Sequence, residues 1–406
     1  MASKMSTSKD NASALRVLYI NHTILKSGAA ISLGTLLKAL ADKVVPCFLL
    51  RKGSQVDQIL GVSDQTPRHY ARWVAQCLTT MYGAALPLPQ FCWQLVKTPL
   101  AATRAGWLAH HWNCDVVHVN ETTLPFDAAG AAMAGLPVFV HARTALNQRP
   151  FERSVLDALA RFPKVHFVAI DDEVKDSLPA RCRSKCTVVH NPIHLGPTPS
   201  PDAIEKKRAE WGLGPEHLIV GQLASLHAAK GIWDIIDLAV TLCPNHSNLR
   251  FVLVGDTSPD AGEGEALKEA IAARGLSGKV ILPGYDRDLA TAYGALDIAL
   301  CLFGAGLGGL GRAAYEAALA GRALIATLPG ARTSKTLVHG RHGLLFEPDD
   351  LGGVRDGILS LLLDPVQRAE LGTTAKSEIG ARHVPTATAE QMLKLYRQAT
   401  IRLRRC

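Results

Sequence analysis

The residues around position 310 have the types and spacing that hold a phosphate group in parallel α/β proteins. Residues 297–303 predict a buried strand, Gly308, Gly309 and Gly311 follow in a glycine-rich loop, and residues 312–320 predict a helix. In this arrangement backbone N–H groups and the positive end of the helix dipole point at one place and stabilise an anion there. We therefore expect an anion-binding site at this loop. The alternative is that the glycines serve only a tight turn and close helix packing.

Residues 306–311 also match the G-x-G-x-x-G pattern of dinucleotide-binding folds. That pattern requires an acidic residue about twenty positions later, at the end of the next strand, to bind the ribose. The next strand is expected at 323–327, and residues 328–332 after it contain no carboxylate. The sequence therefore favours a nucleotide diphosphate over NAD or FAD.

Length and composition limit the class of protein. A chain of 406 residues is too long for one ordinary core, so two domains are expected. No uninterrupted apolar run reaches the roughly 18 residues that a membrane-spanning helix needs. Residues 1–14 lack the apolar core of a signal peptide and are expected to form a flexible tail. Nine cysteines, an odd number, fit a reducing cytosol, so we expect a cytoplasmic protein.

Apolar runs alternate with helical patterns along most of the chain, the order that produces a parallel sheet in each half. Strands are expected at 16–20, 44–50, 115–119, 137–140, 165–170, 187–189, 217–222, 250–255, 280–282, 297–303 and 323–327, and helices at 31–40, 126–134, 231–242, 263–274, 312–320 and 387–403. We therefore predict an α/β protein with two Rossmann-like domains that face each other across a cleft, where ligands bind at the carboxyl ends of the strands.

The predicted boundaries follow the change in composition near residue 192, where prolines cluster as in a linker. They are a tail at 1–14, an N-terminal domain at 15–192, a linker at 193–213, a second domain at 214–383 and a C-terminal helix at 384–406 that packs back on the N-terminal domain.

The segment 65–114 contains no Asp or Glu, although the chain as a whole carries a net charge of +8. Its basic residues are Arg68, Arg72, Lys97 and Arg104, and it holds four of the six tryptophans, Trp73, Trp93, Trp107 and Trp112. Residues 73–82 place apolar side chains on one helical stripe. These features predict docking on an anionic membrane surface, and the alternative is that the stripe packs on the domain core. Nucleic acid is not expected as a partner, because no known binding module accompanies the positive charge.

Several sequence strings resemble a known family. Residues 311–327 and 340–349 are similar to the E-A-x-A-x-G-x-P-V-I-A and G-x-x-G-x-L-x-x-P-x-D signature of retaining glycosyltransferases of family 4, which have the GT-B fold. Further similar strings are residues 27–33, 115–121, 230–231 and 251–256. The resemblance covers nearly the whole chain from Arg16. It implies an N-terminal acceptor domain, a C-terminal domain that binds a nucleotide-sugar donor, and no need for a metal ion or other cofactor.

The resemblance also assigns residues to the donor. Lys230 is expected to neutralise the diphosphate and Glu316 to contact the ribose, and these two are the candidate catalytic residues. The expected donor-binding residues are Gly28, Ser225, Lys230, Gly308, Gly309, Gly311, Arg312 and Glu316. Two of them depart from the family pattern: Gly308 stands where a glutamate is usual, and Ser225 where an arginine is usual. Arg312 or Lys335 is the expected replacement for that arginine.

Polar residues at the ends of two N-terminal strands are the candidate acceptor contacts. Asn120 and Glu121 end one expected strand, and His141 and Arg143 end the next. His118 is expected to be a core histidine. No metal site is expected: Asp286 and Asp288 have the spacing of a metal-binding D-x-D motif, but they stand where aspartate caps a helix.

Together these features predict the transfer of a sugar from a UDP- or GDP-sugar, and the resemblance implies retention of configuration. The expected acceptor is a lipid-linked glycan in cell-surface polysaccharide assembly, at the inner face of the membrane. The alternatives are a nucleotide-sugar epimerase on the same fold and a catalytically weakened sugar-nucleotide-binding protein.

Overall fold

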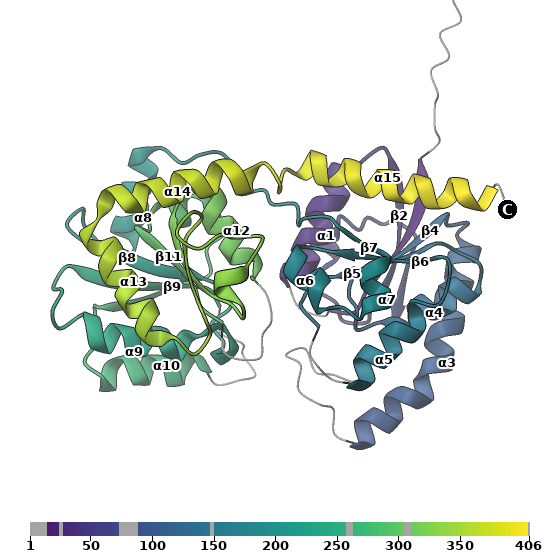
Figure 1. Cartoon of the computed structure of the whole chain (residues 1–406), viewed down its shortest axis with the longest axis horizontal. Helices are drawn as coiled ribbons and strands as arrows, with labels where there is room; N and C mark the ends of the chain where they lie inside the picture. The colour runs from purple at the N-terminus through teal and green to yellow at the C-terminus, as the bar shows by residue number, and fades with distance from the viewer. Residues whose placement is uncertain are drawn as a thin grey trace, which may run out of the picture.

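The computed structural model describes residues 14–23, 27–72, 88–146, 150–256, 263–303 and 310–404. Within these residues the chain forms two α/β lobes that lie side by side (Figure 1). The predicted stripe at 73–82 and the glycines Gly308 and Gly309 lie outside the described residues.

The N-terminal lobe is built on a parallel sheet. Its described strands are β1 (Leu15–Asn21), β2 (Val44–Arg51), β3 (Arg68–Ala71), β4 (Val116–Val119), β5 (Val138–Ala142), β6 (Val165–Ala169) and β7 (Cys186–Val188), in the order β3-β2-β1-β4-β5-β6-β7. Its described helices are α1 (Gly28–Ala39), α2 (Asp57–Leu60), α3 (Leu88–His111), α4 (Pro125–Met133), α5 (Pro150–Leu159), α6 (Asp172–Ser177) and α7 (Ala180–Ser184). The strand order reverses between β1 and β4. In such sheets ligands bind at the carboxyl ends of the two strands on either side of the reversal.

The C-terminal lobe repeats the same plan. Its described strands are β8 (Leu218–Leu223), β9 (Leu249–Val254), β10 (Val280–Gly284), β11 (Ile298–Cys301), β12 (Ala323–Thr327) and β13 (Leu344–Phe346), all parallel, in the order β10-β9-β8-β11-β12-β13. Its described helices are α8 (Pro201–Glu210), η1 (Ala228–Lys230), α9 (Ile232–Leu242), α10 (Glu263–Ala273), α11 (Leu289–Gly294), α12 (Arg312–Leu319), η2 (Ala331–Thr333), α13 (Leu351–Leu363) and α14 (Pro365–Gly380). Here the order reverses between β8 and β11.

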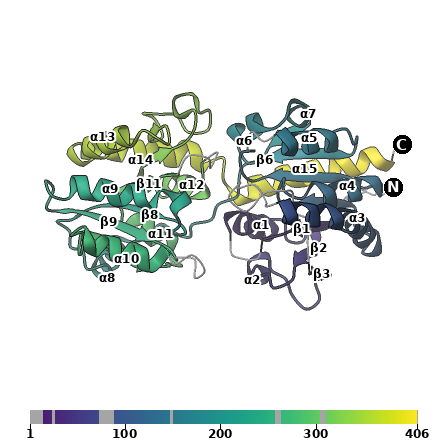
Figure 2. The ribbon, with the colours of Figure 1, turned by 90° about the horizontal axis from the view of Figure 1, so that it is seen from below.

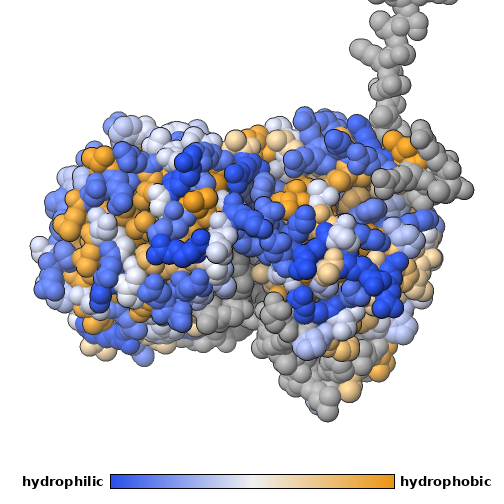
Figure 3. Space-filling view, viewed as in Figure 1, coloured by the Kyte–Doolittle hydropathy of each residue, from blue (hydrophilic) through white to orange (hydrophobic). Residues whose placement is uncertain are grey.

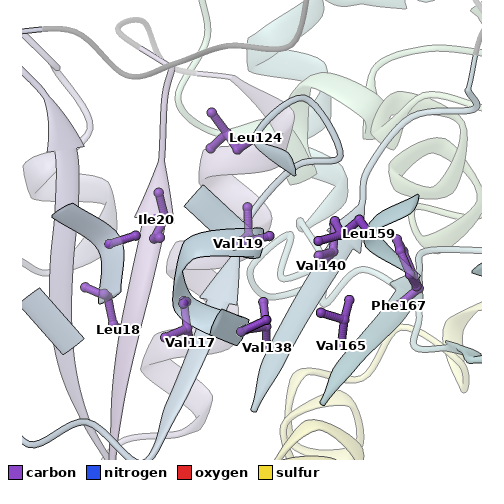
Figure 4. Packing of buried hydrophobic residues seen from close by; sticks show 14 of the residues in the cluster. Leu18, Ile20, Val117, Val119, Leu124, Val138, Val140, Leu159, Val165 and Phe167 are labelled. Atoms are coloured by element: carbon purple, nitrogen blue, oxygen red, sulfur yellow. The ribbon is translucent and has the colours of Figure 1, made fainter. Parts of the chain in front are cut away.

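Both faces of each sheet are buried, which is why the strand sequences are continuously apolar rather than alternating. In the N-terminal lobe Leu18 and Ile20 of β1 point to one face, where they pack with Val117 and Val119 of β4 (Figure 4). Their neighbours Val17 and Tyr19 point to the other face. The expected fold class, two parallel-sheet α/β domains, is confirmed.

The last helix, α15 (Pro385–Arg404), leaves the C-terminal lobe after α14 and runs across the N-terminal lobe (Figures 1 and 2). Met392 and Tyr396 are fully buried in the same cluster as Tyr19 and Leu33 of the N-terminal lobe. The chain therefore crosses between the lobes twice, once through residues 193–200 and once before α15.

Several regions contain more regular structure than the sequence predicted, among them helices α5, α13 and α14 and the two segments that follow. The stretch 193–213, expected to be a linker, contains α8, because Ser200 caps the helix and Pro201 occupies its first position, where proline is favourable. The segment 65–114 contains β3 and the 24-residue helix α3. This helix packs closely on α4: a Cβ atom on Gly130 would lie 2.0 Å from the carbonyl oxygen of Ala102.

Candidate functional site

The candidate donor site lies at the carboxyl ends of β8 and β11, the neighbouring strands between which the order of the C-terminal sheet reverses. Lys230 ends the short helix η1, and Gly231 follows it with φ of 65°, a left-handed conformation that favours glycine. The buried side chain of Gln222 holds this turn in place. Its Nε2 donates to the carbonyl oxygen of Lys230 at 2.7 Å, and its Oε1 accepts from the N–H of Leu302 at 2.8 Å.

The ammonium group of Lys230 lies 4.4 Å from the centre of the Phe303 ring. Burial lowers the pKa of Lys230, and among the described residues no carboxylate forms an ion pair with it. The backbone of Phe303 is fixed by Thr327, whose Oγ1 accepts from the Phe303 N–H at 2.8 Å. Lys230 is therefore a desolvated cation on a rigid support, and an anion placed beside it would favour its charged form.

Gly311, immediately before α12, contacts the same aromatic ring. A Cβ atom on Gly311 would lie 2.4 Å from Cζ of Phe303. The cation of Lys230 and the start of α12 therefore converge on Phe303. Sequence reasoning missed Gln222 and Thr327, which fix this arrangement, although both are polar residues in otherwise apolar strands, and that signal was available.

Glu316 and Arg312 form an ion pair on the first turns of α12. Arg312 Nε donates to Glu316 Oε1 at 2.5 Å, and the hydroxyl of Tyr293 donates to Glu316 Oε2 at 3.4 Å. Burial raises the pKa of Glu316, and the adjacent guanidinium opposes that rise. Both carboxylate oxygens therefore have protein partners in this structure, whereas the sequence led us to expect ribose hydroxyls there.

Arg312 also reaches the N-terminal lobe. Its Nη1 donates to Ser32 Oγ at 3.0 Å and to the carbonyl oxygen of Pro192 at 3.1 Å. A Cβ atom on Gly28 would lie 3.8 Å from Cβ of Arg312, so the starts of α1 and α12 face each other. The two glycine-led helix starts thus meet where the lobes meet. Ser225 is exposed beyond the end of β8.

The other expected replacement cation, Lys335, takes part in a different contact between the lobes. Its Nζ lies 3.0 Å from Asp176 Oδ2 on α6. Beside it Glu173 accepts from the hydroxyls of Ser334, at 2.7 Å, and Thr336. The α6 end of the N-terminal lobe is therefore bound to the segment after η2 through several charged and neutral hydrogen bonds.

Asn120 and Arg143, two of the four candidate acceptor contacts, belong to a buried hydrogen-bond network. Arg143 donates to Asn120 Oδ1 from Nε at 3.1 Å and from Nη2 at 2.9 Å, and from Nη1 to Asn191 Oδ1 at 2.5 Å. Asn120 Nδ2 donates to Asn21 Oδ1 at 3.0 Å. Burial lowers the pKa of Arg143 to about 10. The network ties together the ends of β1, β4 and β5, so both side chains have partners in the fold.

The other two candidates lie in different surroundings. Glu121 accepts from the N–H of Thr122 at 2.9 Å, and burial raises its pKa. Nδ1 of His141 lies 3.3 Å from Nε2 of His118, and Nδ1 of His118 lies 2.6 Å from the hydroxyl of Tyr396 on α15. Burial lowers the pKa of both histidines well below its usual range. His118 is a buried core histidine as expected, and His141 points at it.

The acidic pair tested as a metal site has structural partners. Asp288 caps α11 by accepting from the N–H of Thr291 at 3.1 Å, and Asp286 forms an ion pair with Lys207 at 2.8 Å. Within the described ranges, no three His, Cys, Asp or Glu residues are grouped as metal ligands.

The C-terminal lobe matches a protein family. Residues 203–378 match the family model for glycosyl transferases group 1. No curated protein sequence matches the chain.

The fold matches solved structures over nearly its whole length. A crystal structure of Anabaena Alr3699/HepE in complex with UDP has a TM-score of 0.77 at 21% sequence identity and covers 95% of this chain and 100% of that one. A glycosyltransferase from Rickettsia africae ESF-5 has a TM-score of 0.75 at 17% identity, with 95% and 98% covered. The apo form of the lipopolysaccharide outer core galactosyltransferase WaaB has a TM-score of 0.65 at 12% identity, with 96% and 100% covered. The chain therefore has the GT-B fold.

Proposed function

We propose that this protein is a glycosyltransferase that moves a sugar from a UDP- or GDP-sugar to an acceptor. The observation that carries the proposal is the convergence of Lys230 and the start of α12 on Phe303, within the residues that match glycosyl transferases group 1. Structures of similar fold were solved with UDP and with UDP-glucose. Lys230 follows β8 and α12 follows β11, and these are the two neighbouring strands between which the order of the sheet reverses, the usual place for a ligand.

The chemistry that these groups provide is stabilisation of the leaving diphosphate. The bond between the sugar and the phosphate breaks more readily when the negative charge that develops on the diphosphate is neutralised. Lys230 supplies a positive charge, and the N-terminus of α12 adds about 0.3–2 kcal/mol of favourable interaction with an anion. Because protein groups meet this charge, we propose that the reaction needs no metal ion.

We further propose retention of anomeric configuration, with the acceptor approaching on the face from which the diphosphate departs. The proposed acceptor is a lipid-linked glycan of cell-surface polysaccharide assembly. Two facts support that choice: the chain is basic, with a net charge of +8, and one structure of similar fold is a lipopolysaccharide outer core galactosyltransferase.

The first experiment is a thermal-shift panel of UDP-, GDP- and ADP-sugars, followed by mass spectrometry of products and NMR of the new anomeric proton. We expect stabilisation by one nucleotide and an increase in acceptor mass of one sugar, both unchanged by EDTA. Lys230→Ala abolishes turnover with a normal circular dichroism spectrum, while the exposed Lys268→Ala in the same lobe retains activity. Near-full activity of Lys230→Ala would refute the assignment of that residue.

Two observations favour a second candidate, a protein that binds sugar nucleotides without transferring the sugar. Ser225 is exposed where the resemblance expects an arginine, and Arg312 is already paired with Glu316. Stabilisation by a nucleotide sugar with neither hydrolysis nor transfer would support this candidate. Conversion of the sugar in the absence of any acceptor would instead indicate an epimerase.

A further inference from the structure

Helix α3 carries a row of exposed apolar side chains. Trp93, Val96, Leu100 and Trp107 have exposed fractions of 60%, 69%, 48% and 61%. They are separated by three, four and seven positions, so they lie on one face of the helix, which we call the α3 stripe. In Figure 3 hydrophobic residues reach the lower right edge of the N-terminal lobe, where Figure 1 places α3.

The opposite face of α3 is fixed to the lobe. Ala101, Ala105 and Leu108 are buried, and a Cβ atom on Gly106 would lie 2.9 Å from Cβ of Ala134, at the end of α4. The exposure of the stripe therefore does not arise because α3 is detached from the lobe. The stripe is a surface feature of a helix whose other side is already packed.

Helix α3, which carries the stripe, contains basic residues but no acidic ones. Residues 65–114 contain no carboxylate. Nζ of Lys97 lies 4.7 Å from the centre of the Trp93 ring, and His111 stacks on Trp107 with ring centres 4.9 Å apart. Arg104, which we expected to contribute, is instead turned inward to Asp127 at 3.6 Å. The stripe thus has a tryptophan at each end, with the Lys97 ammonium group over Trp93 and the His111 ring stacked on Trp107.

We infer that the α3 stripe docks this protein on an anionic lipid surface, with the two tryptophans at the level of the headgroups. An apolar row with aromatic ends and the cation of Lys97 beside it matches the boundary between acyl chains and negative headgroups. Four side chains on one helix are too few for a stable protein interface, which buries about 1,200–2,000 Å² in total. Because residues 65–114 contain no carboxylate, helix α3 itself is not repelled by an anionic surface.

The test is flotation of the full chain with phosphatidylcholine vesicles and with vesicles that also contain phosphatidylglycerol, without any sugar nucleotide. We expect binding to the anionic vesicles that weakens with added salt. Trp93→Gln with Trp107→Gln lowers the partition coefficient by about tenfold or more for the loss of two interfacial aromatic side chains. The matched control, Leu363→Gln with Val366→Gln, removes two apolar side chains that are 80% and 65% exposed on the other lobe and leaves binding unchanged.

Three results would overturn the inference: no flotation of the wild type, equal flotation of the tryptophan double variant, or equal binding to uncharged vesicles. A dimer in light scattering that disappears in the double variant would also overturn it, because the stripe would then be a self-association surface. None of these outcomes depends on sugar transfer. The thermal shift by nucleotide sugars stays unchanged in both double variants, which separates a failure of docking from a failure of the transferase proposal.

Discussion

Replacing Gly231 with alanine tests whether the turn that carries Lys230 is held against the end of β11. Gly231 has φ of 65°, and a Cβ atom on it would lie 2.8 Å from Cβ of Leu302 and 3.1 Å from the carbonyl carbon and oxygen of Leu302. The backbone of Leu302 cannot move away freely, because its N–H is bound by Gln222. The turn itself must therefore shift, and Lys230 shifts with it.

The expected magnitude has two parts. A left-handed conformation costs alanine about 1–2 kcal/mol. The close contact with Leu302 adds about 1–3 kcal/mol, as overpacking in a dense interior usually does. The total of about 2–5 kcal/mol lowers the melting temperature by roughly 4–20 °C for a lobe of this size. If Lys230 loses its contact with the diphosphate, about 1.5–3 kcal/mol of binding is lost as well, so that UDP binds about 10- to 150-fold more weakly.

The assay is thermal unfolding together with isothermal titration of UDP, and Gly275→Ala is the matched control. Gly275 lies in the same lobe with φ of 67°, but a Cβ atom on it would meet no atom within 4 Å. Gly275→Ala should therefore show only the conformational part of the loss in stability and bind UDP normally. If the two variants lose the same stability and Gly231→Ala binds UDP as tightly as the wild type, the reasoning about the Lys230 turn is wrong.

Three further predictions concern charged groups. Burial lowers the pKa of Lys230, so the UDP affinity of the wild type, measured by isothermal titration, should fall as the pH rises through that lowered pKa. Lys230→Arg stays charged, so its UDP affinity should not change with pH. The same pH dependence of affinity in both proteins would contradict this prediction. Glu173→Ala removes the carboxylate that accepts hydrogen bonds from Ser334 and Thr336 across the lobes. We expect the free energy of unfolding to fall by about 1.5–3 kcal/mol and the radius of gyration in small-angle scattering to increase. Glu265→Ala, at an exposed position, is the control, and an unchanged radius of gyration for Glu173→Ala would show that this contact does not hold the lobes together. Burial raises the pKa of Asp127 from 3.8 to about 7, so its contribution to stability is fully present below the unfolded value and is lost as the pH rises through 7. The melting temperature of the wild type relative to Asp127→Asn should therefore fall between about pH 4 and pH 7, and a constant difference would refute the raised pKa.

The sequence by itself determined the features that depend on neighbouring residues. The strands expected at 16–20 and 217–222 are buried parallel strands at 15–21 and 218–223, because a strand covered on both faces needs a largely apolar sequence. Glycines before residue 312 predicted a helix start that could bind an anion; in the structure the start of α12 and Lys230 both lie against the ring of Phe303. Helix α8 was missed because prolines were taken as a sign of a linker, although Pro201 stands at the one helical position that proline favours.

Only the tertiary structure decided the partners of the charged residues. Arg312 meets Ser32 across 280 positions of sequence, and His118 meets Tyr396 across 278. Such pairs follow from how two lobes and a returning helix pack, which no local pattern encodes. Glu316 was expected to contact a ribose, but whether a ribose or Arg312 is its partner depends on where the lobes meet. The sequence thus set the elements and the chemistry of single residues, and packing over long distances set which of those residues remain available to a ligand.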